Sequence, residues 1–379
     1  GTGGKDVAQQ SKQDAHVAQE DAALPEDNVL LKQYQYQFDD SQVDLDLILS
    51  LLRYIFKSEY AVDGSVLVFM PGWDDISRMS RLLKGEPDFG GDKRFRIHQL
   101  HSGVPRKDQN LVFLPLGKGE HKIILSTNIA ETSITIDDVA VVIDAGRMKE
   151  KVYDPHVKLS YLKSEWISQA SARQRKGRAG RTRSGVCFHL FSNRRHNSLP
   201  AFQDSELLRM PLEEIVLQAK ILNVAPGSGD AHDGVLSFLT KAMDPPHVLS
   251  IVNAVSLLQS INCLDSDESI TTMGKAISKL PMDPRMGRMI VLGCILGCGP
   301  AILATAAAMG YRDPFVMPTS DQQRQVCNRL KMQLCRGFPS DQVGLYRAVE
   351  GFSSAWNSYG PHRAYTFCDD NFLSRSTMM

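Results

Sequence analysis

The residues best suited to do chemistry form an arginine- and glycine-rich run, Gln174 to Arg181. If the run is helical, Gln174, Arg178 and Arg181 recur at helical spacing and share one face, with two glycines removing bulk beside it. Two guanidinium groups directed at one point suit the charge that develops on a transferring phosphoryl group, and Gln174 is placed to orient a water. The run predicts a phosphoryl-transfer site, with a solvated basic helix or a localisation signal as the alternative.

A second polar run, Ser126 to Asp137, follows an apolar segment that is typical of a buried strand. Its hydroxyl, amide and carboxylate groups are the kinds that bind phosphates, sugar hydroxyls or magnesium-bound water. A capped turn is the simpler interpretation, because Ser126 or Thr127 can cap a short helix. Its pairing with the arginine-rich run about forty residues further on favours the binding role.

Short apolar runs alternate with helical stretches through the first half of the chain. The pattern predicts a helix at Asp44–Glu59, then strands at Val66–Phe69, Ile97–Leu100, Lys122–Ser126, Val139–Asp144 and Val186–Phe191, with helices between them at Asp74–Lys84, Pro105–Phe113 and Ser168–Gly177. Such alternation is typical of a parallel sheet covered on both faces. Ligands bind such sheets beyond the carboxyl ends of the strands, where we expect the polar residues to lie.

Helical patterns dominate the second half, with predicted helices at Glu206–Leu222 and Val248–Leu258 and a break at Met243–Pro246. The stretch from Met289 to Gly310 carries no charge and has the length of a membrane span. Its internal Gly299-Pro300 pair favours two buried helices instead. Cys294 and Cys298, in the same stretch, are then expected to be buried thiols.

Composition sets few limits: 42% of residues are hydrophobic, the net charge is zero, and no charge excess points to nucleic acid. The seven cysteines lack the paired spacing of a zinc site, so no metal site is expected, and they suggest a reducing compartment, the nucleus or the cytoplasm. The segment from Gly1 to about Asp27 has almost no large apolar residues and is predicted to be disordered.

The runs Ser126–Asp137 and Gln174–Arg181 together resemble motifs V and VI of the DEAH-box (superfamily 2) RNA helicases. Further segments also resemble that family: Phe69–Gly72 its motif IV, Leu100–Ser102 an RNA-contact motif, Lys151–Asp154 the start of its strand-separating hairpin, and Met243–Pro246 with Thr272–Pro281 its winged-helix and ratchet signatures. The resemblance covers Asp44 to Met379. Pro71–Asp74 and Glu165–Trp166 are most similar to the RNA helicase A and G-quadruplex-resolving subgroup.

The resemblance implies an α/β RecA-like parallel-sheet domain, a winged-helix domain and an all-α, ratchet-like helical bundle. The expected boundaries are residues 1–40 for a flexible segment, 41–200 for the second RecA-like domain, 201–268 for the winged helix and 269–379 for the ratchet. The sequence has no Gly-x-x-x-x-Gly-Lys-Ser/Thr loop and no Asp-Glu-x-His run, which the family carries in its first RecA-like domain. We therefore expect a fragment with half an ATP site, without the family's OB-fold domain and inactive alone.

The resemblance also assigns roles to single residues. Arg178 and Arg181 match the arginine fingers on the ATP γ-phosphate, and Gln174 the residue that positions water. Thr135 matches a hydroxyl near the metal and phosphates, Asp137 the ribose contact, and Phe113 the ring that stacks on adenine, although Phe113 is about equally well explained as a core residue. ATP and magnesium are thus the expected cofactors, with the magnesium ligands mostly in the first RecA-like domain. Contacts to the RNA backbone are assigned to Gly72, His101, Ser102, Thr127 and Asn128, although His101 also suits a structural role.

The function implied is ATP-driven 3′-to-5′ unwinding of RNA by the intact protein. Its expected partners are single-stranded or structured RNA, including G-quadruplexes, and its own first RecA-like domain, with no membrane. Two alternatives stay open: a non-catalytic scaffold, derived from a helicase, that binds RNA or protein, and a helicase that acts on DNA.

Overall fold

The computed structural model describes residues 29–57, 64–91, 94–117, 119–132, 134–179, 181, 184–227, 234–311, 313–316, 318 and 321–379. The predicted disordered segment, Gly1 to about Asp27, lies outside these residues. The chain divides into two compact units, Gly1–Ile48 and Leu49–Met379. Helix α2, Val29–Gln37, belongs to the first unit. Helix α3, Leu45–Lys57, carries the predicted apolar stripe and runs from the first unit into the second.

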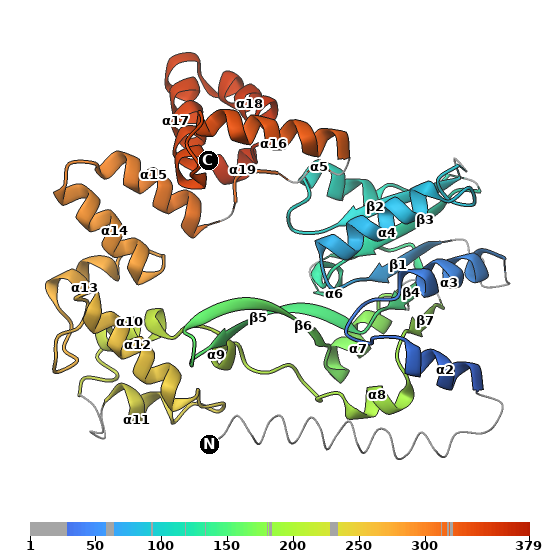
Figure 1. The fold of residues 1–379 in the computed structure, drawn as a ribbon, viewed down its shortest axis with the longest axis horizontal. Helices are drawn as coiled ribbons and strands as arrows, with labels where there is room; N and C mark the ends of the chain where they lie inside the picture. The colour runs from blue at the N-terminus through green and yellow to red at the C-terminus, as the bar shows by residue number, and fades with distance from the viewer. Residues whose placement is uncertain are drawn as a thin grey trace. The chain divides into compact units, whose positions relative to one another are not determined.

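The second unit begins with a five-stranded parallel sheet of order β2-β3-β1-β4-β7 (Figure 1). Its strands are β1 Ser65–Phe69, β2 Phe95–Leu100, β3 His121–Ser126, β4 Val139–Asp144 and β7 Val186–His189. All residues of β1 and β4 are buried, as in a sheet covered on both faces. Each predicted strand is confirmed.

Helices follow most strands of the sheet. They are α4 Trp73–Gly85, α5 Arg106–Gln109 with the 3-10 helix η3 Asn110–Phe113, α6 Ile129–Thr132, α7 Gln169–Lys176 and α8 Asn193–Ser198. A buried cluster joins apolar side chains of β1 to β4 with Val112 of η3, Ala130 of α6 and Ala179. The three predicted intervening helices are confirmed, although Pro105–Phe113 divides into α5 and η3.

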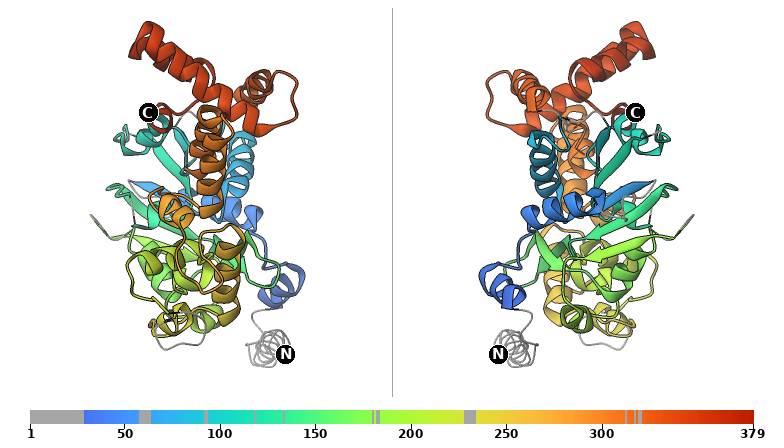
Figure 2. Two further views of the ribbon diagram at one scale, coloured as in Figure 1. Left: turned by 90° about the vertical axis from the view of Figure 1, so that its left-hand side faces the viewer. Right: turned by 90° about the vertical axis from the view of Figure 1, so that its right-hand side faces the viewer.

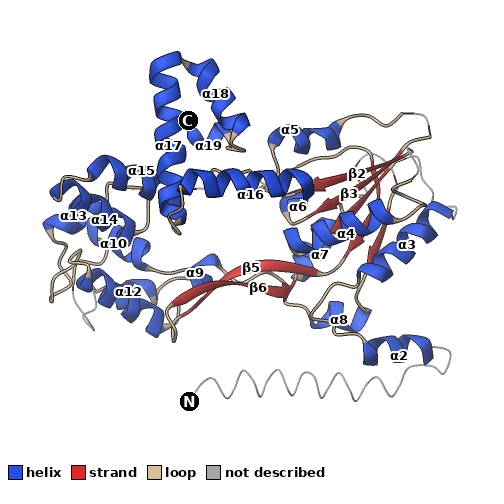
Figure 3. Cartoon of the chain, turned by 45° about the horizontal axis from the view of Figure 1, so that its top comes forward, coloured by secondary structure: helices blue, strands red, loops and turns tan. Residues whose placement is uncertain are grey.

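Between β4 and α7 the chain forms an antiparallel hairpin of β5, Arg147–Asp154, and β6, Leu159–Trp166 (Figure 3). At its base, Met148 and Ile167 pack with Ala172 of α7 and Leu199. Trp166 lies against the Arg147 guanidinium, 3.9 Å from ring centroid to Cζ, and against Phe191. Trp166 therefore packs at the base of the hairpin.

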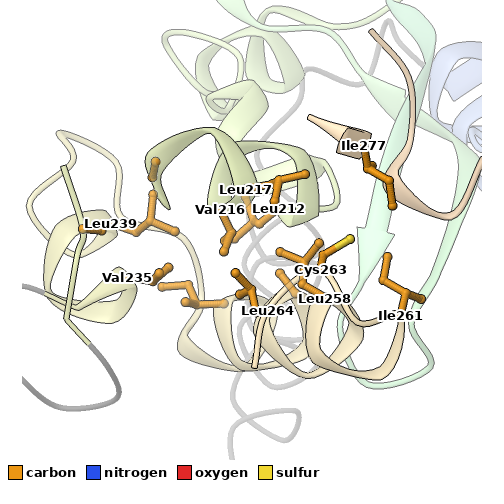
Figure 4. Packing of buried hydrophobic residues seen from close by; sticks show 14 residues of the cluster. Leu212, Val216, Leu217, Val235, Leu239, Leu258, Ile261, Cys263, Leu264 and Ile277 are labelled. Atoms are coloured by element: carbon orange, nitrogen blue, oxygen red, sulfur yellow. The ribbon is translucent and has the colours of Figure 1, made fainter. Parts of the chain in front are cut away.

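A second core lies in the winged-helix region, formed by α9 Glu206–Arg209, α10 Glu213–Ile221, α11 Val235–Leu239 and α12 Val248–Ser260. Leu212, Val216, Leu217, Leu258 and Ile277 are among its buried side chains (Figure 4). A single antiparallel bridge joins Leu264 and Ile270.

The single helix predicted at Glu206–Leu222 is wrong. The structure has two helices, separated by Met210 in an extended conformation, with φ −116° and ψ 154°. Pro211 explains the break, because a proline ring disfavours helical geometry in the residue before it.

The last part of the chain is helical, as predicted: α13 Thr272–Ile277, α14 Pro284–Ile295, α15 Gly299–Gly310, α16 Asp321–Cys335, α17 Asp341–Tyr359, α18 Pro361–Asp370 and α19 Arg375–Met378. The contacts in this part pair α14 with α15, α15 with α17, α16 with α17 and α17 with α18 (Figures 1 and 2). Helices α17 and α18 share a small core around Phe352 and Cys368. Among the described residues, no helix combines the length and apolar character needed to cross a membrane.

The prediction that Met289–Gly310 forms two buried helices is half right. The chain does form two helices, and Pro300 lies in the first turn of α15. However, Ile295 and Leu296 are 71% and 78% exposed, and both Cys294 and Cys298 are exposed thiols. The burial prediction failed because the contacts of α14 and α15 with each other, of α14 with α13 and of α15 with α17 leave these side chains uncovered within the part of the chain that is described.

Candidate nucleotide and RNA site

One edge of the sheet gathers the residues expected to contact RNA. The last residues of three adjacent strands lie in register, with Phe69 of β1 and Leu100 of β2 both opposite Ser126 of β3. The loops that follow these strands carry Gly72, His101, Ser102, Thr127 and Asn128. Backbone bonds join the loops: the Met70 N–H donates to Ser126 O at 2.8 Å, and the Thr127 N–H to Leu100 O at 3.4 Å. The carboxyl edge of the sheet therefore brings all five residues onto neighbouring loops.

Side-chain exposure differs among these residues. Ser102 and Asn128 are exposed, whereas Thr127 is 8% exposed and Gly72 is buried. A Cβ atom on Gly72 would lie 2.8 Å from Cδ and Cε of Lys149. Because Lys149 is flexible, this contact does not by itself require glycine.

His101 accepts a structural hydrogen bond through one of its ring nitrogens. Its Nδ1 accepts a hydrogen bond from the Gly103 N–H at 3.1 Å, and its ring lies 5.5 Å from that of Trp73. Partial burial lowers the pKa of His101, more than Asp74 raises it, so the imidazole is neutral at physiological pH. With Nδ1 accepting, the proton sits on Nε2, which suits donation to a phosphate oxygen.

The residues expected to contact nucleotide lie at the opposite, amino edge. Phe113 precedes β3, Thr135 and Asp137 precede β4, and Arg178 and Arg181 precede β7. The expectation that all functional residues follow carboxyl ends of strands is therefore wrong for this group. Only the residues expected to contact RNA lie directly beyond the carboxyl ends of the strands.

The helical face predicted for Gln174, Arg178 and Arg181 is also wrong. Helix α7 ends at Lys176, and the next residues form a turn in which the Arg178 N–H donates to Arg175 O at 3.1 Å. Two glycines within four residues explain the early end, because glycine is among the poorest helix formers. Gln174 is exposed on the last turn of α7, whereas both arginines lie on the loop beyond it.

The two arginines nevertheless converge with Thr135. Arg181 Nη1 donates to Thr135 Oγ1 at 2.5 Å. Arg178 buries its Nε and Nη1 atoms without a hydrogen-bond partner among the described residues. Partial burial and the neighbouring Arg181 lower the pKa of Arg178, while Glu131 opposes them. Unpartnered guanidinium atoms beside a second positive charge form a place suited to an anion with several acceptor oxygens.

Arg175 is the organising residue that sequence reasoning missed. It is fully buried; its Nε donates to Glu131 Oε2 at 3.0 Å, and its Nη1 to Asp144 Oδ1 at 2.8 Å. His189 Nδ1 lies 3.2 Å from the other Asp144 oxygen, Oδ2. Burial opposes the ionisation of Asp144, but Arg175, the His189 bond and the Gly146 N–H outweigh it and hold the carboxyl pKa below its usual range. Arg175 thereby joins α7, α6 and β4.

Phe113 is not a core residue. Its ring is 50% exposed, while the preceding Val112 is fully buried. Asp137 and Thr135 are exposed as well. The group expected to contact nucleotide therefore presents a flat ring, a carboxylate, a hydroxyl and two guanidinium groups along one edge of the sheet, the arrangement that the resemblance to superfamily 2 helicases implies for a second motor domain.

Comparison with known proteins gives the same class of protein, a helicase. Residues 46–183 match the helicase conserved C-terminal domain, residues 254–282 the winged-helix part of the helicase-associated domain (HA2), and residues 283–341 its ratchet-like part. The DExH-box ATP-dependent RNA helicase DExH6 of Arabidopsis thaliana is 41% identical over 351 residues, which are 92% of this chain and 26% of DExH6. The ATP-dependent DNA/RNA helicase DHX36 of Bos taurus is 40% identical over 340 residues, 90% of this chain and 32% of DHX36.

These matches, in this order along the chain, show that it belongs to the DExH-box helicase family and carries the family's helicase C-terminal domain and HA2 region. The chain spans 26% and 32% of the length of these two relatives.

Proposed function

We propose that the full-length protein is an ATP-dependent helicase that unwinds RNA in the 3′-to-5′ direction. In this proposal the chain supplies one side of an ATP site and one side of an RNA path, and the other side of each comes from a first RecA-like domain. Alone, the chain does not hydrolyse ATP. The observation that carries the proposal is the unpartnered, partly buried guanidinium of Arg178 beside the Arg181–Thr135 pair.

At the amino edge, the free Nε and Nη1 of Arg178 fit the acceptor oxygens of a phosphate, and Arg181 adds a second positive charge. A bound ATP with magnesium would supply the γ-phosphoryl group whose charge grows during transfer. Arg178 and Arg181 stabilise that charge, and Gln174 orients the attacking water. The Thr135 hydroxyl lies near the metal and phosphates, Asp137 binds the ribose, and Phe113 stacks on the base.

At the carboxyl edge, the loops with Gly72, His101, Ser102, Thr127 and Asn128 grip the RNA backbone. This is supported by the exposed hydroxyl and amide of Ser102 and Asn128 and by the proton on His101 Nε2. Contacts to phosphates fix position without reading sequence. The hairpin β5–β6 separates the strands, and the winged-helix and ratchet regions hold the single strand.

Two further candidates remain. DHX36 is described as a DNA/RNA helicase, so DNA duplexes are an alternative substrate class. The resemblance to the G-quadruplex-resolving subgroup adds G-quadruplexes as a further alternative. A scaffold without turnover is the other alternative. Comparing unwinding of matched RNA and DNA duplexes, each with a 3′ overhang, separates the substrate classes, and absence of ATP hydrolysis by the full-length wild type would favour the scaffold.

The decisive variant is Arg178→Ala in the full-length protein. We expect kcat for ATP hydrolysis to fall about 10³-fold or more, because the loss of an arginine finger has that scale. The RNA dissociation constant should stay within about two-fold, since RNA is assigned to the other edge.

Arg173→Ala is the matched control, because Arg173 is exposed on α7 and its replacement removes the same charge. It should leave kcat nearly unchanged. Turnover retained in Arg178→Ala, or equal losses in both variants, would remove Arg178 from this role.

A further inference from the structure

Lys122, the second residue of β3, is a buried charge that the proposed mechanism does not yet use. Its side chain is 2% exposed, which makes it one of the largest fully buried side chains described. Burying an ammonium group is costly unless its hydrogen-bonding and charge requirements are met. Its contacts therefore need a physical explanation.

The ammonium group has three N–H donors, and three acceptors surround it. Lys122 Nζ donates to Val112 O at 2.8 Å, to Leu114 O at 2.9 Å and to Asp138 Oδ2 at 2.8 Å. Two of these acceptors are the carbonyl groups on either side of Phe113. The third belongs to the residue next to Asp137.

The first pair of bonds fixes the turn that carries Phe113. The 3-10 helix ends at Phe113, and after it the Leu114 N–H donates to Leu111 O at 3.3 Å. By holding the carbonyl groups before and after Phe113, Lys122 keeps Val112 inward and the Phe113 ring half exposed.

The third bond fixes the turn that carries Asp137. The Asp138 carboxylate is bound by Lys122, and the Asp138 carbonyl oxygen accepts from the Ser65 N–H at 2.8 Å. Asp137 is exposed, and the next residue, Asp138, is held through both its carboxylate and its carbonyl oxygen.

We propose that Lys122 is a positioning residue for the nucleoside part of ATP: one buried ammonium group holds both the ring that stacks on the base and the turn that meets the ribose. The inference rests on the proposed ATP site and adds to it a residue that does not itself touch nucleotide. Lys122 contacts no group assigned to the phosphates, so its effect falls on binding of base and ribose.

The test uses full-length protein with Lys122→Met, Phe113→Ala and the double variant. Methionine keeps an unbranched side chain of similar length but donates no hydrogen bond. Three quantities are measured: KM for ATP, kcat, and the inhibition constant of inorganic tripolyphosphate, which has neither base nor ribose. Val141→Ala, a truncation in the buried strand β4, is the control for general loss of packing.

Loss of a base-stacking contact is worth roughly tenfold in affinity. We expect Phe113→Ala and Lys122→Met each to raise KM about tenfold, with kcat within about twofold and tripolyphosphate inhibition unchanged. The double variant should be close to Lys122→Met alone, because the lysine acts on the ring through its turn. Val141→Ala should leave KM unchanged.

Three results overturn the inference: an unchanged KM in Lys122→Met, equal weakening of tripolyphosphate, or effects of Lys122→Met and Phe113→Ala that multiply in full. If Lys122→Met does not fold, Asp138→Asn is judged by the same measurements. It keeps the size of the side chain but removes the charge that faces the ammonium, and KM should rise about two- to threefold.

The proposed ATP site and the positioning role of Lys122 are tested by separate results. If Arg178→Ala retains turnover, the proposed ATP site is wrong. If Arg178→Ala and Phe113→Ala behave as expected but Lys122→Met matches wild type, only the role of Lys122 is wrong.

Discussion

The two edges of the sheet are built in different ways. At the carboxyl edge, the residues expected to contact RNA come within a few residues after β1, β2 and β3, and parallel pairing alone brings their loops together. At the amino edge, the groups converge through contacts between residues distant in sequence, such as Arg181 with Thr135, 46 residues apart, and Lys122 with Asp138, 16 residues apart. The carboxyl-edge loops present exposed polar groups, and buried charges lie beneath both edges: Lys122 at the amino edge, and Arg175, bound to Asp144 at the last residue of β4, at the carboxyl edge.

This difference has an energetic consequence. A buried charge with satisfied partners is costly to disturb, since removing one partner leaves the others unpaired and without solvent. An exposed side chain on a loop can be truncated with little effect on folding. Substitutions of these buried charges should therefore affect stability, and those of exposed residues on the carboxyl-edge loops should affect binding.

The largest effect on stability is expected for Arg175→Met. Methionine fills part of the volume but leaves the buried Asp144 and Glu131 carboxylates without their cation. We expect the free energy of unfolding to fall by about 3–5 kcal/mol, measured by urea unfolding of this chain.

Lys176→Met is the matched control, because Lys176 is the next residue of α7 and is exposed. Its effect should stay within about 0.5 kcal/mol. A loss below about 1 kcal/mol in Arg175→Met would mean that the network does not hold α6, α7 and β4 together.

The same contrast explains what could be read from the sequence. The strands were predictable because their apolar runs are short and bounded by turn residues, and the carboxyl-edge residues were assigned through the resemblance to helicase motifs. The buried network of Arg175 was not, because its partners Glu131 and Asp144 lie 44 and 31 residues away. Nothing local distinguishes Arg175 from the exposed Arg173 on the same helix.

The wrong predictions have local or packing causes. The shared helical face of Gln174, Arg178 and Arg181 assumed that a helix would continue through two glycines, and the structure instead ends α7 at Lys176. The buried thiols of α14 and α15 assumed that an uncharged stretch is covered on all sides. Periodicity identifies an apolar face, but it does not show what packs against that face.

A smaller effect, confined to the carboxyl edge, is expected for Asn128→Ala in the full-length protein. The exposed amide contributes to RNA binding in our proposal, and one hydrogen bond to a charged phosphate is worth about 1.5 kcal/mol or somewhat more. RNA-stimulated ATP hydrolysis at limiting RNA should fall about tenfold, while the basal rate without RNA stays unchanged.

Asn193→Ala, at an exposed asparagine at the start of α8, serves as the control and should match wild type in both rates. Equal falls in the basal and stimulated rates of Asn128→Ala would show that the two edges are not separate in function.

The smallest expected effect is a pH dependence from His98, which lies on β2 near the charges behind the amino edge. Its Nε2 is buried without a hydrogen-bond partner among the described residues. Burial lowers the pKa of His98 to about 4, helped by Lys122 and Arg96 and opposed by Asp138. In the unfolded chain the imidazole has its ordinary pKa of about 6.5.

Between these two pKa values the unfolded chain binds more protons than the folded one, so the free energy of unfolding rises with pH. The contribution of His98 is fully present above pH 6.5 and is lost as the pH falls towards 4. Urea unfolding of wild type and His98→Gln across this window should therefore show a shallower slope in the variant. His362→Gln, at an exposed histidine of α18, should retain the wild-type slope. Parallel plots of unfolding free energy against pH for wild type and His98→Gln would mean that His98 takes up its proton equally well in the folded and unfolded chains. Burial and the neighbouring positive charges would then lower the pKa of His98 less than the structure indicates.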